Sequence, residues 1–243
     1  MEKNTVTISL GIQDLHSHNS VAKKSKLQNS ADRIKKDIVV WLLNGGMSFD
    51  PKKDSIGNEV LFSQHRRRAD LLILSDSFHA LEIKGDADRL TKLSCQLEDY
   101  CKTFDKVSVV ITKKHLVNAK KIIPRSVGLI LVEGERIIVL RDPRMNQRLD
   151  KASLLMFLNK KLLLGLLKTK GNRLFIGELR QQAVKKRTDA IRECAYQRLK
   201  EIHTKLFQRF VKETHGYPIQ IDEIRALSAE VSPIHFSKLD DEA

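Results

Sequence analysis

Two neighbouring stretches decide the fold: residues 68–74 read RADLLIL and residues 79–86 read HALEIKGD. Apolar runs of this length are typical of strands that are covered on both faces of a sheet. Glu82 and Lys84 are two residues apart, so a strand projects both side chains from one face. Asp70, at the start of the neighbouring strand, can reach the same face. The two stretches therefore predict a pair of buried strands with a charged cluster at one end of the sheet.

This cluster has the composition of a metal site. Two carboxylates and an ammonium group that converge lose hydration, and such a cluster persists most readily when a metal ion and a phosphate complete it. Mg²⁺ usually takes one or two carboxylates and keeps water and a substrate phosphate. Asp70 and Glu82 can supply the carboxylates, and the backbone carbonyl of Ile83 can add a third ligand. Lys84 would stabilise the transition state of phosphodiester hydrolysis, and Glu59 could be an outer ligand or bind a second metal.

The surrounding pattern predicts an α/β core at 30–145. Ser30 is expected to cap an amphipathic first helix that ends near Asn44, with Lys35 among the charged residues opposite its apolar face. A helix beginning at Asp86 or Asp88 and ending near 104 should follow the third strand. The predicted strands are 56–62, 69–75, 78–84, 107–112, 127–132 and 136–141, with a short helix at 115–122. This order predicts a mixed sheet flanked by helices.

The charge of the chain favours a polyanionic partner. The 243 residues carry 44 Lys and Arg against 30 Asp and Glu, a formal net charge of +14. Residues 151–215 contain 16 basic and 5 acidic residues and so hold +11 of this excess. We therefore expect a basic helical subdomain at 150–215, with one helix at 154–167 and a long helical region at 176–213. Residues 1–29 are expected to form a disordered basic arm, and residues 216–243 a loosely ordered tail.

The basic helices admit three interpretations. They could clamp nucleic acid, form a homodimer through the apolar face at 191–210, or only keep an apolar appendage soluble. Their charge density favours nucleic acid, and of the nucleic acids we expect DNA rather than RNA as the partner. The arginine loop before the second strand could equally be a solvated loop or a phosphate contact. The candidate nucleic-acid-binding residues are Arg66, Arg67, Arg68, Lys185, Lys186 and Arg187.

The number and spacing of the cysteines and the hydropathy of the chain indicate the cellular compartment. The three cysteines make an odd number without C-x-x-C spacing, so neither a disulfide framework nor a zinc site is suggested. The most apolar stretch, 154–167, is interrupted by polar residues and is shorter than the roughly 20 apolar residues that a membrane span needs. The sequence thus predicts a protein of the reducing cytoplasm that does not contact a membrane.

At this point the residues resemble the PD-(D/E)XK nuclease superfamily, because Asp70 is followed after an eleven-residue interval by Glu-Ile-Lys at 82–84. The resemblance is closer to one bacterial and phage branch, whose motifs are similar to R-x-D-L, E-I-K-S-D-x-D-x-x-x-R-L and Q-x-x-x-Y. It covers roughly residues 31–135, with Gln96 and Tyr100 in the last motif. Ala69 replaces the namesake proline, which is not a ligand. Gly85 and Lys92 replace the branch's serine and arginine.

The resemblance implies a restriction-endonuclease-like core in which Asp70 and Glu82 bind Mg²⁺ or Mn²⁺ and Lys84 is the catalytic lysine. Glu59 fills the acidic position of the preceding strand, and Gln96 the polar helix position, whereas Tyr100 is expected to pack in the core. The implied function is metal-dependent cleavage of DNA in a phage, mobile-element or defence context. The main alternative is a catalytically inactive nucleic-acid-binding or regulatory protein on the same fold. A helical interaction protein with an incidental α/β domain would instead require the charged triad to be scattered in space.

Overall fold

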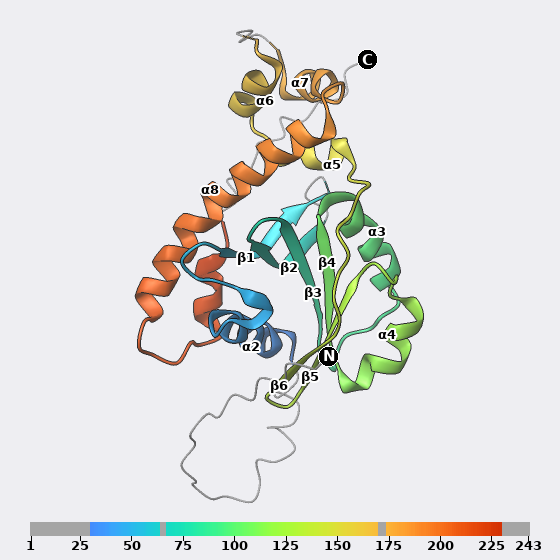
Figure 1. Cartoon of the computed structure of the whole chain (residues 1–243), viewed down its shortest axis with the longest axis vertical. Coiled ribbons are helices and arrows are strands. Elements are labelled where there is room, and N and C mark those ends of the chain that lie inside the picture. Colours follow the sequence, from blue (N-terminus) through green and yellow to red (C-terminus); the bar gives the residue numbers. More distant parts are fainter. Residues whose placement is uncertain (1–29, 64–66, 170–173, 230–243) are drawn as a thin grey trace, which may run out of the picture.

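The computed structural model of the chain describes residues 30–63, 67–169 and 174–229. The arm predicted at 1–29 lies outside these ranges, and so do Arg66 and residues 230–243 of the predicted tail. The described part is an α/β structure in which helices flank a six-stranded mixed sheet (Figure 1). The predicted α/β class is therefore confirmed.

The strands follow one another across the sheet in chain order. The first three pair antiparallel, the third to fifth pair parallel, and the sixth returns antiparallel to the fifth. Their bounds are β1 (Ser55–Phe62), β2 (Arg67–Leu74), β3 (Phe78–Lys84), β4 (Lys106–Thr112), β5 (Gly128–Glu133) and β6 (Arg136–Arg141). Every residue of β3 is buried, as expected of a central strand that is covered on both faces.

Helices cover both faces of this sheet. Ser30 caps the first described helix as predicted, because its hydroxyl accepts a hydrogen bond from the N–H of Arg33 (3.3 Å). The helices are α2 (Ala31–Leu43), α3 (Leu93–Thr103), α4 (Leu116–Ile122), α5 (Lys151–Leu155), α6 (Lys160–Leu167), α7 (Ile176–Ala183) and α8 (Thr188–Thr214), and the 3-10 turns are η1 (Gly46–Ser48), η2 (Lys113–His115) and η3 (Asp222–Leu227). None of the helices in the described ranges is long and apolar enough to cross a membrane.

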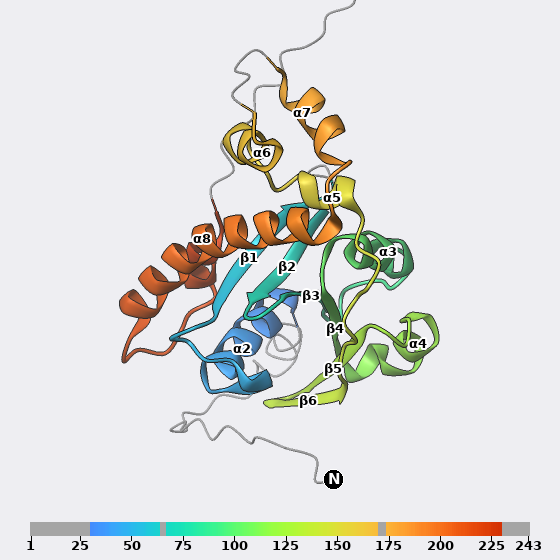
Figure 2. The same cartoon turned by 45° about the horizontal axis from the view of Figure 1, so that its top comes forward.

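Alternation along the strands divides the core into two layers. Leu72 and Leu74 of β2 pack with α3, α4, α5 and the first half of α8. Leu71 and Ile73 face the other way and pack with α2 and the second half of α8. Figure 2 shows α8 crossing the sheet on the side of β1, which it contacts. Ala80, Glu82 and Lys84 are two residues apart along β3 and therefore lie on the same face of the sheet, the one that α3 covers.

Three predicted helices have different bounds in the structure. The stretch 154–167 forms α5 and α6 rather than one helix, because the side chain of Asn159 accepts the N–H of Leu162 (3.0 Å) and caps a new helix start. The region 176–213 likewise divides into α7 and α8. Neither Asp86 nor Asp88 caps α3: Asp86 accepts a hydrogen bond from a threonine hydroxyl (2.5 Å), and Asp88 accepts the N–H of Gly85 (2.7 Å).

The apolar face predicted at 191–210 as a dimer surface is used inside the chain. Ile191, Ala195, Leu199 and Phe210 are buried in the chain's own core. A homodimer through the C-terminal helices would therefore have to use a different surface of these helices.

Candidate active site

β2 and β3 separate at the end of the sheet where Asp70 and Glu82 lie. The pairing of the two strands stops at Leu71 and Leu81. Beyond this point the carboxylate of Asp70 accepts a hydrogen bond from the N–H of Ile83 (2.6 Å). Within a strand the N–H and C=O of one residue face the same neighbouring strand. The carbonyl of Ile83 therefore faces the same gap as the carboxylate of Asp70.

Glu82 is the centre of a buried network beneath α3. Its Oε1 accepts a hydrogen bond from the side-chain amide of Gln96 (2.8 Å) and lies 2.7 Å from Nζ of Lys84. Its Oε2 accepts a hydrogen bond from the hydroxyl of Tyr100. Lys84 also donates to Oε1 of Gln96 (3.1 Å). Glu82 and Lys84 are only 3% and 9% exposed, so the network is largely shielded from solvent.

Tyr100 has two functions in this structure. Its ring packs against Phe62 and Phe104 in the core, as expected. Its hydroxyl also reaches Glu82, so Tyr100 is a site residue as well as a core residue. The spacing of four residues from Gln96 indicates this second role, because it places both side chains on one helix face, from which both can point to the end of the sheet.

Lys35 is the site residue that sequence reasoning missed. We expected it on the solvent side of the first helix, but its side chain is only 9% exposed. Its Nζ donates to Oε1 of Glu59 and lies 3.9 Å from Oδ1 of Asp70. Lys35 reaches the site from α2, on the sheet face opposite to α3. The prediction was wrong because a long lysine stem can be buried while its ammonium group finds a polar partner.

Glu59 interrupts the pairing of β1 with β2. The pairs on both sides of it keep one register, which places Glu59 opposite Asp70. The backbone of Glu59 has φ of 51°, a left-handed conformation that is uncommon for a residue other than glycine. Backbone strain of this kind is concentrated at functional sites.

The surroundings of Asp70 disfavour its ionisation. Burial and, next, the charge of Glu82 raise the pKa of Asp70 to about 7, although the N–H of Ile83 and the charge of Lys35 act in the opposite direction. Burial and the charges of Glu82 and Asp70 raise the pKa of Tyr100 well above its ordinary value, so its hydroxyl remains a donor. Such an excess of negative charge favours a bound cation.

The donor set suits one hard cation. In the described ranges, no group of three or more His, Cys, Asp or Glu side chains is arranged to hold a metal ion, but Mg²⁺ commonly takes only one or two carboxylates. A carboxylate has about four lone-pair positions. Glu82 directs three of them to Gln96, Lys84 and Tyr100, and Asp70 accepts a bond from Ile83. Each carboxylate therefore keeps an oxygen lone pair with which it can bind a shared ion.

The candidate phosphate-binding residues differ in their surroundings. Arg67 pairs with Asp99 of α3 (2.9 Å). The side chain of Arg68 is 64% exposed, and its guanidinium lies 4.0 Å from Glu59, beside the site. Residues 185–187 lie between α7 and α8. Among the residues that the structure describes, no hydrogen bond or ion pair joins them to the carboxylate cluster.

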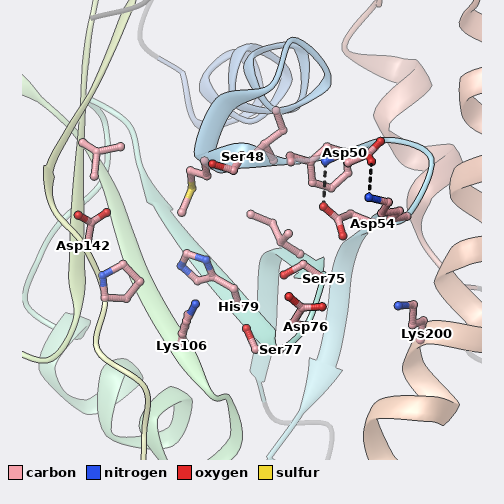
Figure 3. Close-up of a pocket in the computed structure, with 17 residues that line it drawn as sticks. Ser48, Asp50, Asp54, Ser75, Asp76, Ser77, His79, Lys106, Asp142 and Lys200 are labelled. Atoms are coloured by element: carbon pink, nitrogen blue, oxygen red, sulfur yellow. Dashed lines mark hydrogen bonds and ion pairs between the residues drawn. The ribbon is translucent and has the colours of Figure 1, made fainter. Parts of the chain in front are cut away.

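A cavity of about 630 Å³ lies at the opposite end of β2 and β3 (Figure 3). It is lined by the turn 75–77, His79, Lys106 and Lys200, among others. His79 is buried and contacts Ser108 (2.9 Å), and burial lowers its pKa to about 3. Ligands of open α/β sheets bind outside the carboxyl ends of the parallel strands. This rule favours the end with Glu82 and Lys84 as the active site, rather than the cavity.

The fold and the cluster thus define an α/β protein with two carboxylates and a lysine at the carboxyl end of a mixed sheet. The family model of bacteriophage P4 protein cII matches residues 24–228. Protein cII of Enterobacteria phage P4 is 31% identical over 204 residues, which are 80% of this chain and 76% of that protein. The chain therefore belongs to the bacteriophage P4 protein cII family, and the predicted phage context is supported.

One solved structure was also matched, that of a protein of unknown function from Silicibacter pomeroyi. It is 17% identical, and the match covers 42% of this chain and 67% of that protein with a TM-score of 0.32. A score this low supports no inference about fold or function.

Proposed function

We propose that this chain is a metal-dependent nuclease of the restriction-endonuclease-like type, which cleaves phosphodiester bonds in cytoplasmic DNA. The observation that carries the proposal is the convergence of Asp70, Glu82, Lys84 and Gln96 where β2 and β3 separate. The order of helix, three antiparallel strands, helix and parallel strand around this point supports it further. Buried charged groups with perturbed ionisation in this position are typical of catalytic sites.

Each residue of the cluster has its own role in the proposed reaction. Asp70, Glu82 and the carbonyl of Ile83 would hold Mg²⁺ or Mn²⁺. Such an ion would lower the pKa of a water molecule and neutralise charge on the phosphate. Lys84 lies beside Glu82 and stabilises the negative charge that develops during attack. Gln96 fixes the positions of Glu82 and Lys84 through its two hydrogen bonds, and Glu59 assists from β1.

Arg68 is the described residue best placed to receive the nucleic-acid backbone. Its guanidinium is exposed and lies next to the acidic cluster, so a phosphate bound there would approach the metal position. The exposed Lys185 and Arg187 and the half-buried Lys186 would add sequence-independent contacts from the helical part, because basic side chains bind phosphates without reading bases.

Cleavage assays test this proposal. Linear, nicked and single-stranded DNA and RNA should be incubated with Mg²⁺ or Mn²⁺ and with the wild type, Asp70→Ala or Lys84→Ala. We expect cleavage by the wild type and a loss of about 10²-fold or more in each variant, the size of effect seen when a transition-state stabilising group is removed. The matched controls Asp76→Ala and Lys113→Ala change exposed residues outside the cluster and should leave the rate unchanged. Equal rates in all variants would refute the assignment of the site.

The second candidate is a non-catalytic nucleic-acid-binding protein on the same scaffold. The observation that favours it is the direct ion pair of Lys84 with Glu82, which gives the carboxylate a partner without any metal. This candidate predicts binding of the same nucleic acids without cleavage under either metal, and binding that is unaffected by Asp70→Ala.

A further inference from the structure

Lys35 places a fixed positive charge inside the acidic cluster. Its ammonium group donates to Glu59 and lies 3.9 Å from Asp70. The residue is 7% exposed, and its neighbours Ile34 and Ile38 on α2 are 1% and 0% exposed. A buried ammonium group is costly unless carboxylates neutralise it. The packing of α2 therefore holds this cation between the two carboxylates rather than in solvent.

The backbone of β1 departs from regular strand geometry at Glu59, the residue that binds Lys35. Glu59 adopts φ of 51° between two regularly paired stretches of the strand. A left-handed residue other than glycine is strained, so it persists only where its surroundings require it. The carboxylate of Glu59 binds Lys35, whereas that of Glu82 binds residues of β3 and α3. Glu59 and Glu82 thus belong to two different sets of partners, with Asp70 between them.

The charge balance of the site limits how many divalent ions it can take. Glu59, Asp70 and Glu82 carry three carboxylates, which are faced by the ammonium groups of Lys35 and Lys84 and by the more exposed guanidinium of Arg68, 4.0 Å from Glu59. These three cations already balance the three carboxylates, so one divalent ion gives the site a positive charge, which suits a phosphodiester. A second ion would add two more positive charges beside Lys35, whose side chain is only 9% exposed, so that their repulsion is weakly screened.

We propose that Lys35 takes the place of a second metal ion. The site then binds one divalent cation through Asp70 and Glu82, and Glu59 holds Lys35 instead of a metal. Lys35 is thus a positioning residue that acts through Glu59 and Asp70. This inference rests on the proposed nuclease function and specifies the number of metal ions that the same site holds.

Counting bound Mn²⁺ tests the proposal without reference to activity. Isothermal titration calorimetry and the electron paramagnetic resonance signal of free Mn²⁺ would be recorded for the full chain. We expect one ion per wild-type chain and two per Lys35→Met chain, because the substitution frees Glu59 and one side of Asp70. The double variant Lys35→Met with Glu59→Gln should return to one. Lys36→Met is the matched control: it lies next on α2, pairs with Asp37 of the same helix and should leave the count at one.

Lys35→Gln keeps the proposal testable if Lys35→Met does not fold, because it removes the charge but keeps a polar partner for Glu59. This variant should also bind two Mn²⁺ ions per chain. Two ions in the wild type, or only one in a folded Lys35→Met or Lys35→Gln chain, would overturn the role of Lys35 and leave the nuclease proposal standing. A wild-type chain that binds no Mn²⁺ would overturn both.

Discussion

At the scale of single residues, the neighbours of Asp70 act in opposite directions on its ionisation. It accepts the N–H of Ile83 and lies near Lys35, both of which favour its charged form. Burial and the charges of Glu82 and Glu59 oppose that form and prevail, so the pKa of Asp70 rises to about 7. The folded protein therefore holds this carboxylate at a cost in stability, which is common for groups kept for function.

Asp70→Asn should consequently stabilise the protein, and the gain should depend on pH. The asparagine oxygen can still accept the N–H of Ile83, but the charge is absent. Because the pKa of Asp70 is raised on folding, the wild type is not penalised near pH 4, where the carboxyl is protonated in the folded state. The penalty grows as pH rises and is complete above pH 7. A rise of about 3 pKa units corresponds to at most about 4 kcal/mol, and the partial solvent exposure of Asp70 reduces this value, so we expect a gain of about 2 kcal/mol at pH 8 and almost none near pH 4.

Urea unfolding of the wild type and Asp70→Asn at pH 4, 6 and 8 measures this difference. Asp76→Asn, which changes an exposed aspartate, is the control and should show no pH-dependent gain. If Asp70→Asn is less stable than the wild type at pH 8, Asp70 is not held under electrostatic strain.

The residues of the site differ in how far the sequence could reveal them. Asp70, Glu82 and Lys84 could be proposed because charges stand out in apolar strands, and Gln96 because it resembles a motif position. Lys35 could not, because a lysine among polar helix residues has the pattern of a solvated one, and its partners come from β1 and β2. The left-handed φ of Glu59 could not be predicted from the sequence either, since only the folded sheet brings Glu59 opposite Asp70.

At the scale of elements, α8 is attached to the sheet by a buried ion pair. Arg192 donates to both oxygens of Asp105 (2.7 and 2.5 Å), and Asp105 also accepts the N–H of Phe78 at the start of β3 (2.9 Å). Asp105 is 1% exposed. The guanidinium of Arg192 lies 5.7 Å from the centre of the Phe78 ring. This contact fixes the first half of α8 against the strand that carries the candidate site.

Arg192→Met should destabilise the protein because it leaves a buried carboxylate with only one of its partners. Removal of one member of a buried pair costs about 3–5 kcal/mol, and the remaining bond to Phe78 should reduce this to about 2–4 kcal/mol. Arg209→Met is the control on the same helix, since its pair with Glu213 is exposed and should contribute less than about 0.5 kcal/mol. Equal midpoints of urea unfolding for the two variants would contradict the structural role of Arg192.

The elements themselves were predictable to different degrees. The strands lie within one or two residues of their predicted bounds, because continuous apolar runs between turn residues are distinctive. The helices after residue 150 were less predictable. The apolar periodicity continues across 156–159 and therefore predicts one helix. The side chain of Asn159 instead bonds to the backbone and starts α6, and periodicity does not indicate such a local bond.

At the scale of the whole molecule, the two ends of the central strands have different properties. One end has the carboxylate cluster, the exposed Arg68 and the gap between β2 and β3. The other has the cavity beside His79 and the attachment of α8. The chain belongs to the bacteriophage P4 protein cII family, and we propose for it a nuclease site at the first of these ends.

The single-turnover rate of DNA cleavage with Mg²⁺, measured before and after chelation, tests the central claim most directly. The comparison is between the wild type and Glu82→Gln, with Glu135→Gln as the control for an exposed carboxylate. We predict that chelation abolishes wild-type cleavage, that Glu82→Gln is slower by about 10²-fold or more, and that Glu135→Gln is unchanged. Cleavage that survives chelation, or that Glu82→Gln retains in full, would contradict the claim.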